Sequence, residues 1–256
     1  MKAIVRYILL TASRDFLFLG LFVMILAAYG FSLFTGSTAL VEQQQMTVAY
    51  FAGTSRVILI MGLVTFICFH IRRAFENREI ETILSKPLSR VQFVLSYWIG
   101  YVVLVVLASL SPILIFLVIG GVDSFGLIYW GSSLLMEASL MMAFALVAAL
   151  VLRSAVTALF SVAAFYLVSR LMGFLMIAID NPNALLHGLG WQADVMTFIL
   201  KIVSVTFPRF DLFARSEWLI YGVAERNDLW LFQVQSLIYL PLLLGIAVVD
   251  FRRKQF

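Results

Sequence analysis

The stretch VQFVLSYWIGYVVLVVLASLSPILIFLVIGGV, residues 91–122, contains no charged side chain. About 20 consecutive apolar residues cross the hydrocarbon core of a bilayer as a helix that rises 1.5 Å per residue. A run of this length therefore predicts a membrane-spanning helix and decides the fold class. Phe16–Phe34 and Leu229–Val249 are two further charge-free runs that are long enough to span.

The composition of the whole chain agrees with this interpretation. Of its 256 residues, 63% are apolar and 12% are charged, whereas soluble domains have roughly 45–50% and about 25%. A soluble fold of this size cannot hide so much apolar surface from water. We therefore predict an all-α integral membrane protein that forms a single domain over residues 1–256.

Three more apolar segments each carry one charged residue, namely Arg56, Glu137 or Arg170. Together with the charge-free runs they predict six transmembrane helices. The predicted spans are residues 16–34, 48–71, 91–119, 126–152, 154–179 and 229–250.

The distribution of basic residues predicts the topology. Lysine and arginine concentrate at both termini and in the connection 72–90, whereas the connections on the other side carry a small acidic excess. Positive charge gathers on the cytoplasmic side of membrane proteins. We therefore expect a multi-pass protein of the bacterial inner membrane with both termini in the cytoplasm. The net charge of +4 is then a signal of topology, and we expect no nucleic-acid partner.

Two regions outside the spans leave alternatives open. The extracytoplasmic region 180–228 holds two apolar segments, Ala193–Phe207 and Leu212–Ala224, which Pro208 separates. Both are short for spans and are interrupted by charge, so we predict re-entrant helices rather than two additional spans. At the other end, MKAIVRYILLTASRD (residues 1–15) mixes cationic and apolar residues. It is either an interfacial helix or an extension of the first span.

The connection between the second and third spans is unusually dense in charge. Its helix-forming core, Glu76–Ser85, predicts an amphipathic helix with an apolar stripe at i, i+3 and i+4 and a charged opposite face. Proline ends this helix, because the residue before a proline is pushed out of the α region. The stripe is Ile80, Ile83 and Leu84, the charged face includes Glu76, Arg78, Glu79 and Glu81, and the proline is Pro87.

Membrane topology alone does not account for the glutamates in this connection, because they dilute the positive-inside signal. We predict that the helix docks a cytoplasmic protein and transmits force to the two attached spans. The alternative is a helix that rests on the inner leaflet, where glutamates would face an anionic surface.

The sequence ENREIETILSKPLSRVQFVLSYWIG, residues 76–100, resembles the corresponding segment of ABC transporter type-2 permeases. In that family a glutamate-rich cytoplasmic helix is followed by a similar start of the third span, and the six-span layout and chain length also agree. The chain departs from the family pattern where a typical lysine is replaced by Tyr97 and Trp98, which we interpret as membrane-interface anchors.

The resemblance implies a type V exporter-like permease with an N-terminal interfacial helix, a coupling helix between spans 2 and 3, and short re-entrant helices between spans 5 and 6. It implies two copies of this chain and two copies of a cytoplasmic ABC ATPase subunit, which would bind ATP and Mg. It also allows periplasmic or accessory membrane subunits. The segment that would dock the ATPase is the charged connection, and the resemblance is nearly silent about substrate.

Motifs of catalysis and metal binding are missing from the sequence. The chain has one cysteine, Cys68, so it cannot form an internal disulfide or a CxxC site. His70 and His187 lie far apart in sequence, and no G-x-x-x-x-G-K-[ST] loop is present to cradle a nucleotide. We therefore expect no cofactor or metal in this chain and no enzymatic activity of its own.

The charges inside the predicted spans are candidate functional residues, because each costs a few kcal/mol near the centre of a bilayer. Counted from the nearest cytoplasmic charge, Arg56, Glu137 and Arg170 all lie about 24–26 Å along their helices. Their common height allows Glu137 to pair with either arginine. The cluster is either a structural ion pair, with arginines that extend to the outer interface, or an outer gate of a transport pathway.

Two other classes of function remain as alternatives. One is a membrane scaffold that transports nothing, whose partner ATPase drives assembly of an envelope complex. The other is an ion-coupled secondary transporter, which needs acidic or histidine relays near the centre of the membrane. Only Glu137 comes close to such a relay in this sequence.

Overall fold

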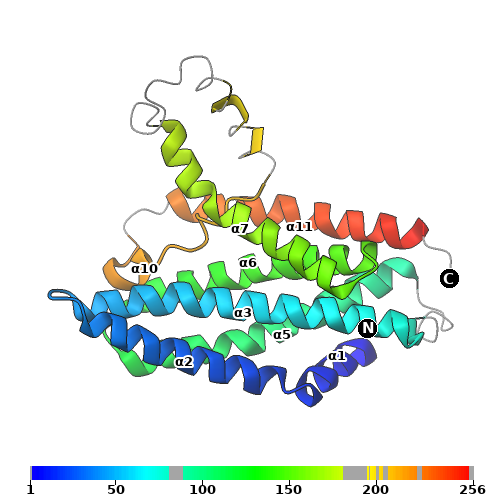
Figure 1. Ribbon diagram of the computed structural model, residues 1–256, viewed down its shortest axis with the longest axis horizontal. Helices are drawn as coiled ribbons and strands as arrows, with labels where there is room; N and C mark the ends of the chain where they lie inside the picture. The colour runs from blue at the N-terminus through cyan, green and yellow to red at the C-terminus, as the bar shows by residue number, and fades with distance from the viewer. Residues whose placement is uncertain are drawn as a thin grey trace.

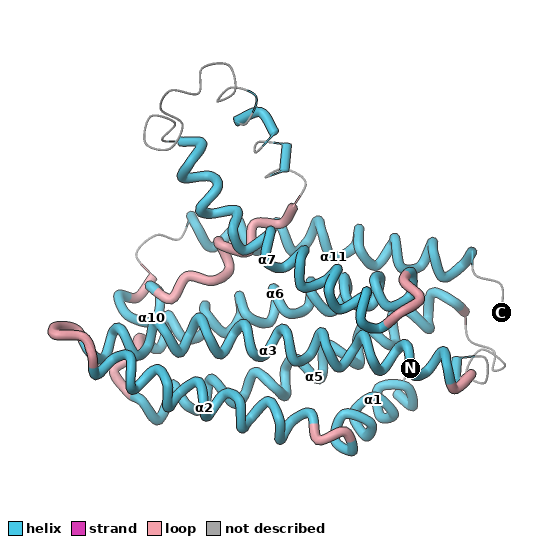
Figure 2. Tube along the Cα trace, viewed as in Figure 1, coloured by secondary structure: helices cyan, strands magenta, loops and turns pink. Residues whose placement is uncertain are grey.

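A computed structural model describes residues 2–80, 89–180, 195, 197–199, 202–203, 207–223 and 227–253. The regular structure of these residues is helical (Figure 2). The helices, in the order of the chain, are α1 (Lys2–Arg14), α2 (Leu17–Ser37), α3 (Gln43–Glu76), α5 (Arg90–Ile119), α6 (Ser124–Val151), α7 (Ala155–Asp180), α10 (Glu217–Tyr221) and α11 (Asn227–Arg253).

Six of these helices are long and apolar enough to cross a membrane, as the sequence predicts: α2, α3, α5, α6, α7 and α11. Several exceed their predicted bounds. The longest helix is α3. Its 34 residues correspond to about 50 Å, which is well beyond a hydrocarbon core about 30 Å thick. We infer that α3 extends past the membrane and carries its terminal charges into water.

The bundle is organised around α6, which packs against α3, α5, α7 and α11. Figure 1 shows α3 and α6 in the middle of the bundle. Small residues on α6, among them Ala143, Ala145 and Ala149, are fully buried. Their size lets neighbouring helices approach closely, which replaces the hydrophobic driving force that is missing between helices in lipid.

The N-terminal segment forms a helix separate from the first span. Phe16 adopts a left-handed backbone, with φ 53°, between α1 and α2. A left-handed residue interrupts a right-handed helix, so the expectation of one continuous helix is wrong. Helix α1 packs on α5, where the Ile8 side chain lies so close to Gly100 that an added Cβ would stand 2.6 Å from Ile8 Cδ1. The position of α1 at the membrane interface stays a prediction.

The charged connection begins differently from the prediction. Glu76 is the last residue of α3, Asn77 and Arg78 form a turn, and helical backbone resumes at Glu79. Arg78 has φ 55°, which no right-handed helix contains. The predicted helix therefore does not start at Glu76. Ile80 is buried inside this chain, so it is not an open docking residue. The predicted docking residues outside the described part of the chain are Glu81, Ile83, Leu84 and Pro87.

The longest described stretch of region 180–228 is residues 207–223. Consecutive turns at Phe210–Phe213 precede the five-residue helix α10, which ends before Gly222 with φ 73°. Of the helix predicted over Leu212–Ala224, the described residues are helical only at Glu217–Tyr221, because i→i+3 backbone hydrogen bonds form turns at Leu212, Phe213 and Ala214. Most of the other predicted helix, Ala193–Phe207, lies outside the described residues.

The prediction that Tyr97 anchors the chain at the interface is also wrong. Its side chain is fully buried, with the ring 4.5 Å from that of Phe93 and 6.1 Å from that of Tyr101, measured between centroids. Trp98 is half-buried, and its Nε1 donates to the backbone carbonyl of Ser139 at 3.4 Å. Tyr97 also joins α5 to α3 through His70, with 6.2 Å between ring centroids, and Trp98 joins α5 to α6.

Candidate functional site

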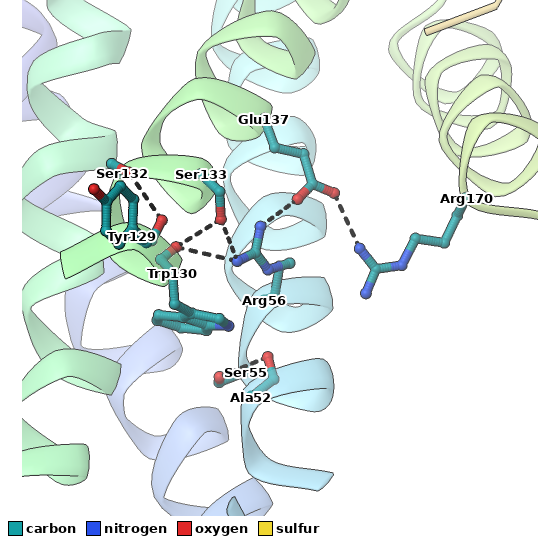
Figure 3. A network of polar contacts seen from close by, with 9 residues as sticks. All are labelled: Ala52, Ser55, Arg56, Tyr129, Trp130, Ser132, Ser133, Glu137 and Arg170. Carbon is teal, nitrogen blue, oxygen red and sulfur yellow. Dashed lines mark hydrogen bonds and ion pairs between the residues drawn. The ribbon is translucent and has the colours of Figure 1, made fainter. Parts of the chain in front are cut away.

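A buried charge cluster joins three of the candidate spans. Arg56 of α3 and Glu137 of α6 form an ion pair of 2.6 Å between Nη1 and Oε2, and their side chains are 1% and 0% exposed (Figure 3). Arg170 of α7 approaches the other carboxylate oxygen, with 3.4 Å between Nη1 and Oε1. The prediction that Glu137 could pair with either arginine is confirmed for both.

The face of α6 that receives Arg56 is built by helical spacing. Trp130, Ser133 and Glu137 follow one another at intervals of three and four residues, so they lie on one face. The second terminal nitrogen of Arg56, Nη2, donates to Ser133 Oγ at 3.0 Å and to the Trp130 carbonyl at 3.2 Å. The guanidinium also lies 4.9 Å from the centre of the Trp130 ring, an attraction between cation and π system. Sequence analysis missed Trp130 and Ser133, although their spacing from Glu137 indicates this shared face.

The two arginines of the cluster are not equivalent. Arg56 makes a short, buried pair with Glu137 and has two further acceptors. Arg170 is 24% exposed, and its interaction with Glu137 is longer. One carboxylate faces two guanidinium groups, so these three residues carry one net positive charge. We assign that excess to Arg170, because Arg56 already balances Glu137 at short range.

Several buried polar atoms beside the cluster have no hydrogen-bond partner among the described residues. They are Arg56 Nε, the Tyr166 hydroxyl and Ser169 Oγ. Tyr166 and Ser169 precede Arg170 on α7 by four residues and one residue. An unpaired buried polar group costs about 1–3 kcal/mol. The cluster therefore contains more buried polar groups than the described residues can satisfy with hydrogen bonds.

A second candidate site is the charged connection, which is bonded to other helices at both of its ends. On the α3 side, Glu79 accepts a hydrogen bond of 2.5 Å from the Tyr7 hydroxyl of α1. Burial, together with this hydrogen bond and the glutamate charge, raises the pKa of Tyr7 to about 12. The hydroxyl therefore keeps its proton at neutral pH and can donate it to Glu79.

On the α5 side, Ser89 and Gln92 form a capping box that starts the helix. Ser89 Oγ accepts from the Gln92 backbone N–H, and Gln92 Oε1 accepts from the Ser89 N–H, both at 3.2 Å. Arg90 Nη1 donates to the carbonyls of Phe251 and Arg252 at 3.0 and 2.7 Å. Such contacts satisfy the last carbonyls of α11 and complement its dipole.

The described residues offer no cluster of three or more histidine, cysteine, aspartate or glutamate side chains that could hold a metal ion. His70 is instead buried among aromatic rings, with Nδ1 2.9 Å from the Tyr101 hydroxyl. Cys68, two residues before it on α3, is also buried.

The fold and these two sites define a multi-pass helical membrane protein, by the length and composition of its helices. Comparison of the chain with protein-family models and with curated protein sequences finds no match.

Proposed function

We propose that this chain is the membrane permease subunit of an ATP-driven ABC exporter. Two copies would pair, the substrate would pass between them, and two copies of a separate cytoplasmic ATPase subunit would supply the energy. The proposal draws on the sequence of residues 76–100, which resembles type-2 permeases. It agrees with six candidate spans and with a bundle that has α1, the end of α3 and the end of α11 at one end (Figure 1).

The observation that carries the proposal is the way in which the charged connection is held. It continues directly into α3 and α5, hydrogen-bonds to α1 through Glu79, and is bonded to α11 through Arg90. A push on this connection therefore acts on four helices at once. A connection that served only to reverse the chain direction would need none of these bonds.

The described part of this connection offers charged rather than apolar side chains to a partner. Glu76 and Arg78 are exposed, Glu79 is half-buried, and Ile80 is turned into the protein. We propose that the charged residues contact the ATPase, while Ile80 anchors the connection to the membrane domain. Glu81 is included in this docking surface from the sequence alone.

Within this proposal the buried cluster acts as an outer gate. Arg56, Glu137 and Arg170 hold α3, α6 and α7 together by charge. Separation of these helices would require the pairs to break, so that ATP binding at the opposite end could be linked to opening here. A structural ion pair is the simpler alternative, and transport by the folded Glu137→Gln variant distinguishes the two.

The cluster gives less support to an ion-coupled secondary transporter. Such a transporter passes ions or protons between neighbouring acidic or histidine side chains in the membrane. Glu137 is in contact with two arginines, and in the described residues no acidic or histidine neighbour is bonded to it.

The proposal is tested by co-expressing the chain with an ATPase subunit encoded beside its gene and measuring co-purification. We expect the two proteins to purify together and the double variant Glu79→Lys/Glu81→Lys to lose the ATPase while still inserting into the membrane. The matched control is Glu217→Lys, the same charge reversal on an exposed residue of α10 at the other end of the bundle (Figure 1). Loss of the ATPase from the control as well, or its retention by the double variant, would contradict the proposed docking surface.

A second variant separates docking from force transmission. Tyr7→Phe removes the hydrogen bond to Glu79 but leaves every carboxylate in place. We expect the ATPase to bind this variant normally and ATP-dependent flux in proteoliposomes to fall. Flux that needs no ATP would refute the exporter, and ATPase binding without any flux would favour the scaffold.

A further inference from the structure

An open groove of about 540 Å³ lies beside the buried cluster. One of its walls is a single face of α3, where Ala49, Gly53 and Val57 follow at intervals of four residues. Arg170 of α7 also lines the groove. The complete set of described lining residues is Met46, Ala49, Tyr50, Gly53, Thr54, Val57 and Arg170.

The polar chemistry of this groove comes chiefly from Arg170. The Thr54 hydroxyl already donates to the Tyr50 carbonyl at 2.7 Å, and most of the other lining groups are apolar. Among the described residues, Arg170 is the one charged side chain that lines the groove. A positive charge in an otherwise apolar groove favours a ligand that has one negative group and a hydrocarbon part.

The carboxylates of the described residues around Arg170 do not cancel its excess charge. Glu137 is engaged at shorter range by Arg56. Asp211 packs against Gly173, one turn further along α7, but it pairs with Arg209 at 2.8 Å. An anionic ligand would therefore supply the counter-charge that this position lacks, and a cation within an apolar span is costly without one.

The shape of the groove suits a chain molecule. From Met46 to Val57 the α3 face extends over about 16 Å, which is roughly half the thickness of the hydrocarbon core. Gly53 lies in the middle of this face, and a Cβ built there would meet nothing within 4 Å. The surface is therefore open along its length to an extended hydrocarbon chain.

We propose that this groove binds an amphiphile with an anionic headgroup, with the headgroup paired to Arg170 and the hydrocarbon chain along α3. The binding site is a property of this chain alone. The statement that such an amphiphile is the class of molecule exported rests on the proposed function.

The test measures lipid binding by the purified chain in mild detergent, without any ATPase, by native mass spectrometry. The probes are phosphatidylglycerol and phosphatidylcholine with identical acyl chains, a long-chain fatty acid, and inorganic phosphate. We expect phosphatidylglycerol and the fatty acid to bind about tenfold more tightly than phosphatidylcholine, the factor that about 1.4 kcal/mol of ion pairing provides. Inorganic phosphate should not bind, because it lacks the hydrocarbon chain.

Three variants assign this preference to the groove. Arg170→Gln should remove the preference, while Arg170→Lys should retain most of it. Gly53→Leu should weaken binding of both lipids, because its side chain would occupy the open face, where an added Cβ meets nothing within 4 Å. The control is Arg153→Gln, which changes an exposed arginine outside the helices and should leave the preference intact.

Equal binding of the two phospholipids by the wild-type chain would overturn the inference, as would a preference that survives in Arg170→Gln. Binding of inorganic phosphate alone would overturn the proposal that the ligand is an amphiphile. These results are independent of ATPase association. Binding of the anionic lipid without binding of an ATPase would support this site and contradict the proposed function. Binding of an ATPase without a preference for the anionic lipid would contradict this site and leave the proposed function intact.

Discussion

The sharpest prediction concerns Glu137→Gln, which removes one negative charge while keeping the shape of the side chain. The change leaves Arg56, which is 1% exposed, without its charged partner. Removal of one partner from a buried ion pair costs about 3–5 kcal/mol. The amide still offers one acceptor to Arg56, and the Ser133 and Trp130 acceptors remain. We therefore expect the lower end, about 3 kcal/mol of unfolding free energy.

The comparison variant is Arg170→Gln, which removes the outer partner of the same carboxylate. Its pair with Glu137 is 3.4 Å long and the arginine is 24% exposed, so screening by solvent reduces its value. A partly exposed pair of this kind contributes about 1 kcal/mol or less. Both variants are measured by reversible unfolding of the purified chain in mixed micelles, with tryptophan fluorescence as the readout.

The double variant Arg56→Met/Glu137→Gln completes the test. The double variant lacks the unpaired buried cation that Glu137→Gln leaves behind. Its loss of stability should therefore be smaller, by at least about 1 kcal/mol, than the summed losses of Arg56→Met and Glu137→Gln. Equal destabilisation by Glu137→Gln and Arg170→Gln would refute the assignment of Glu137 to Arg56. If Glu137→Gln, under conditions where it stays folded, no longer couples ATP hydrolysis to transport, the cluster is a gate; normal transport by the folded variant would leave only a structural ion pair.

The remaining predictions concern packing, protonation and exposure. Gly126→Ala should destabilise the chain by about 1–3 kcal/mol, because an added Cβ would collide with the backbone carbonyl of Trp218 in α10. Gly20→Ala, where a Cβ meets nothing within 4 Å, should instead be neutral or stabilising by up to about 1 kcal/mol in the same unfolding assay. Because the pKa of Tyr7 is raised from 10.0 to about 12, the unfolded chain releases this proton first, and the stabilisation is complete below pH 10 and lost towards pH 12. The stability difference between wild type and Tyr7→Phe should therefore be constant from about pH 7 to 9 and shrink above pH 10. Cys68 is fully buried, so a maleimide should label it only when the chain unfolds, and rapid labelling of the folded chain would contradict the packing of α3.

The sequence was sufficient for the six long helices because of a simple physical constraint. In lipid every backbone polar group must be bonded within the chain, so a long apolar run has few options besides a helix. The turn after α3 is different. Arginine has no preference for a left-handed backbone, so nothing in residues 75–80 indicates that Arg78 adopts φ 55°. Tertiary contacts such as the bond from Tyr7 to Glu79 accompany that turn, and local propensity does not encode them.

Burial within the bundle was harder to predict than helix formation. In a soluble protein the polar side of a helix marks the surface, and the apolar side marks the core. A helix in lipid can be apolar on both sides, so this contrast disappears. Tyr97 and Trp98 illustrate the loss, because aromatic residues near the start of a span suit headgroups and helix contacts equally well. The structure shows Tyr97 fully buried.

Helix α6 shows which sequence signal survives this loss of contrast. Its inner face is a stripe at intervals of three and four residues that contains a tryptophan, a polar residue, a charge and small or flexible residues. All five members, Trp130, Ser133, Glu137, Met141 and Ala145, are at most 1% exposed. Polar residues in lipid must be turned toward other helices, so the position of Glu137 indicates how α6 is rotated. The equal depth of the three charged residues predicted that Glu137 could pair with either arginine. The packing of α6 against α3 and α7 gives the helix the rotation that brings Glu137 to Arg56 and Arg170 together.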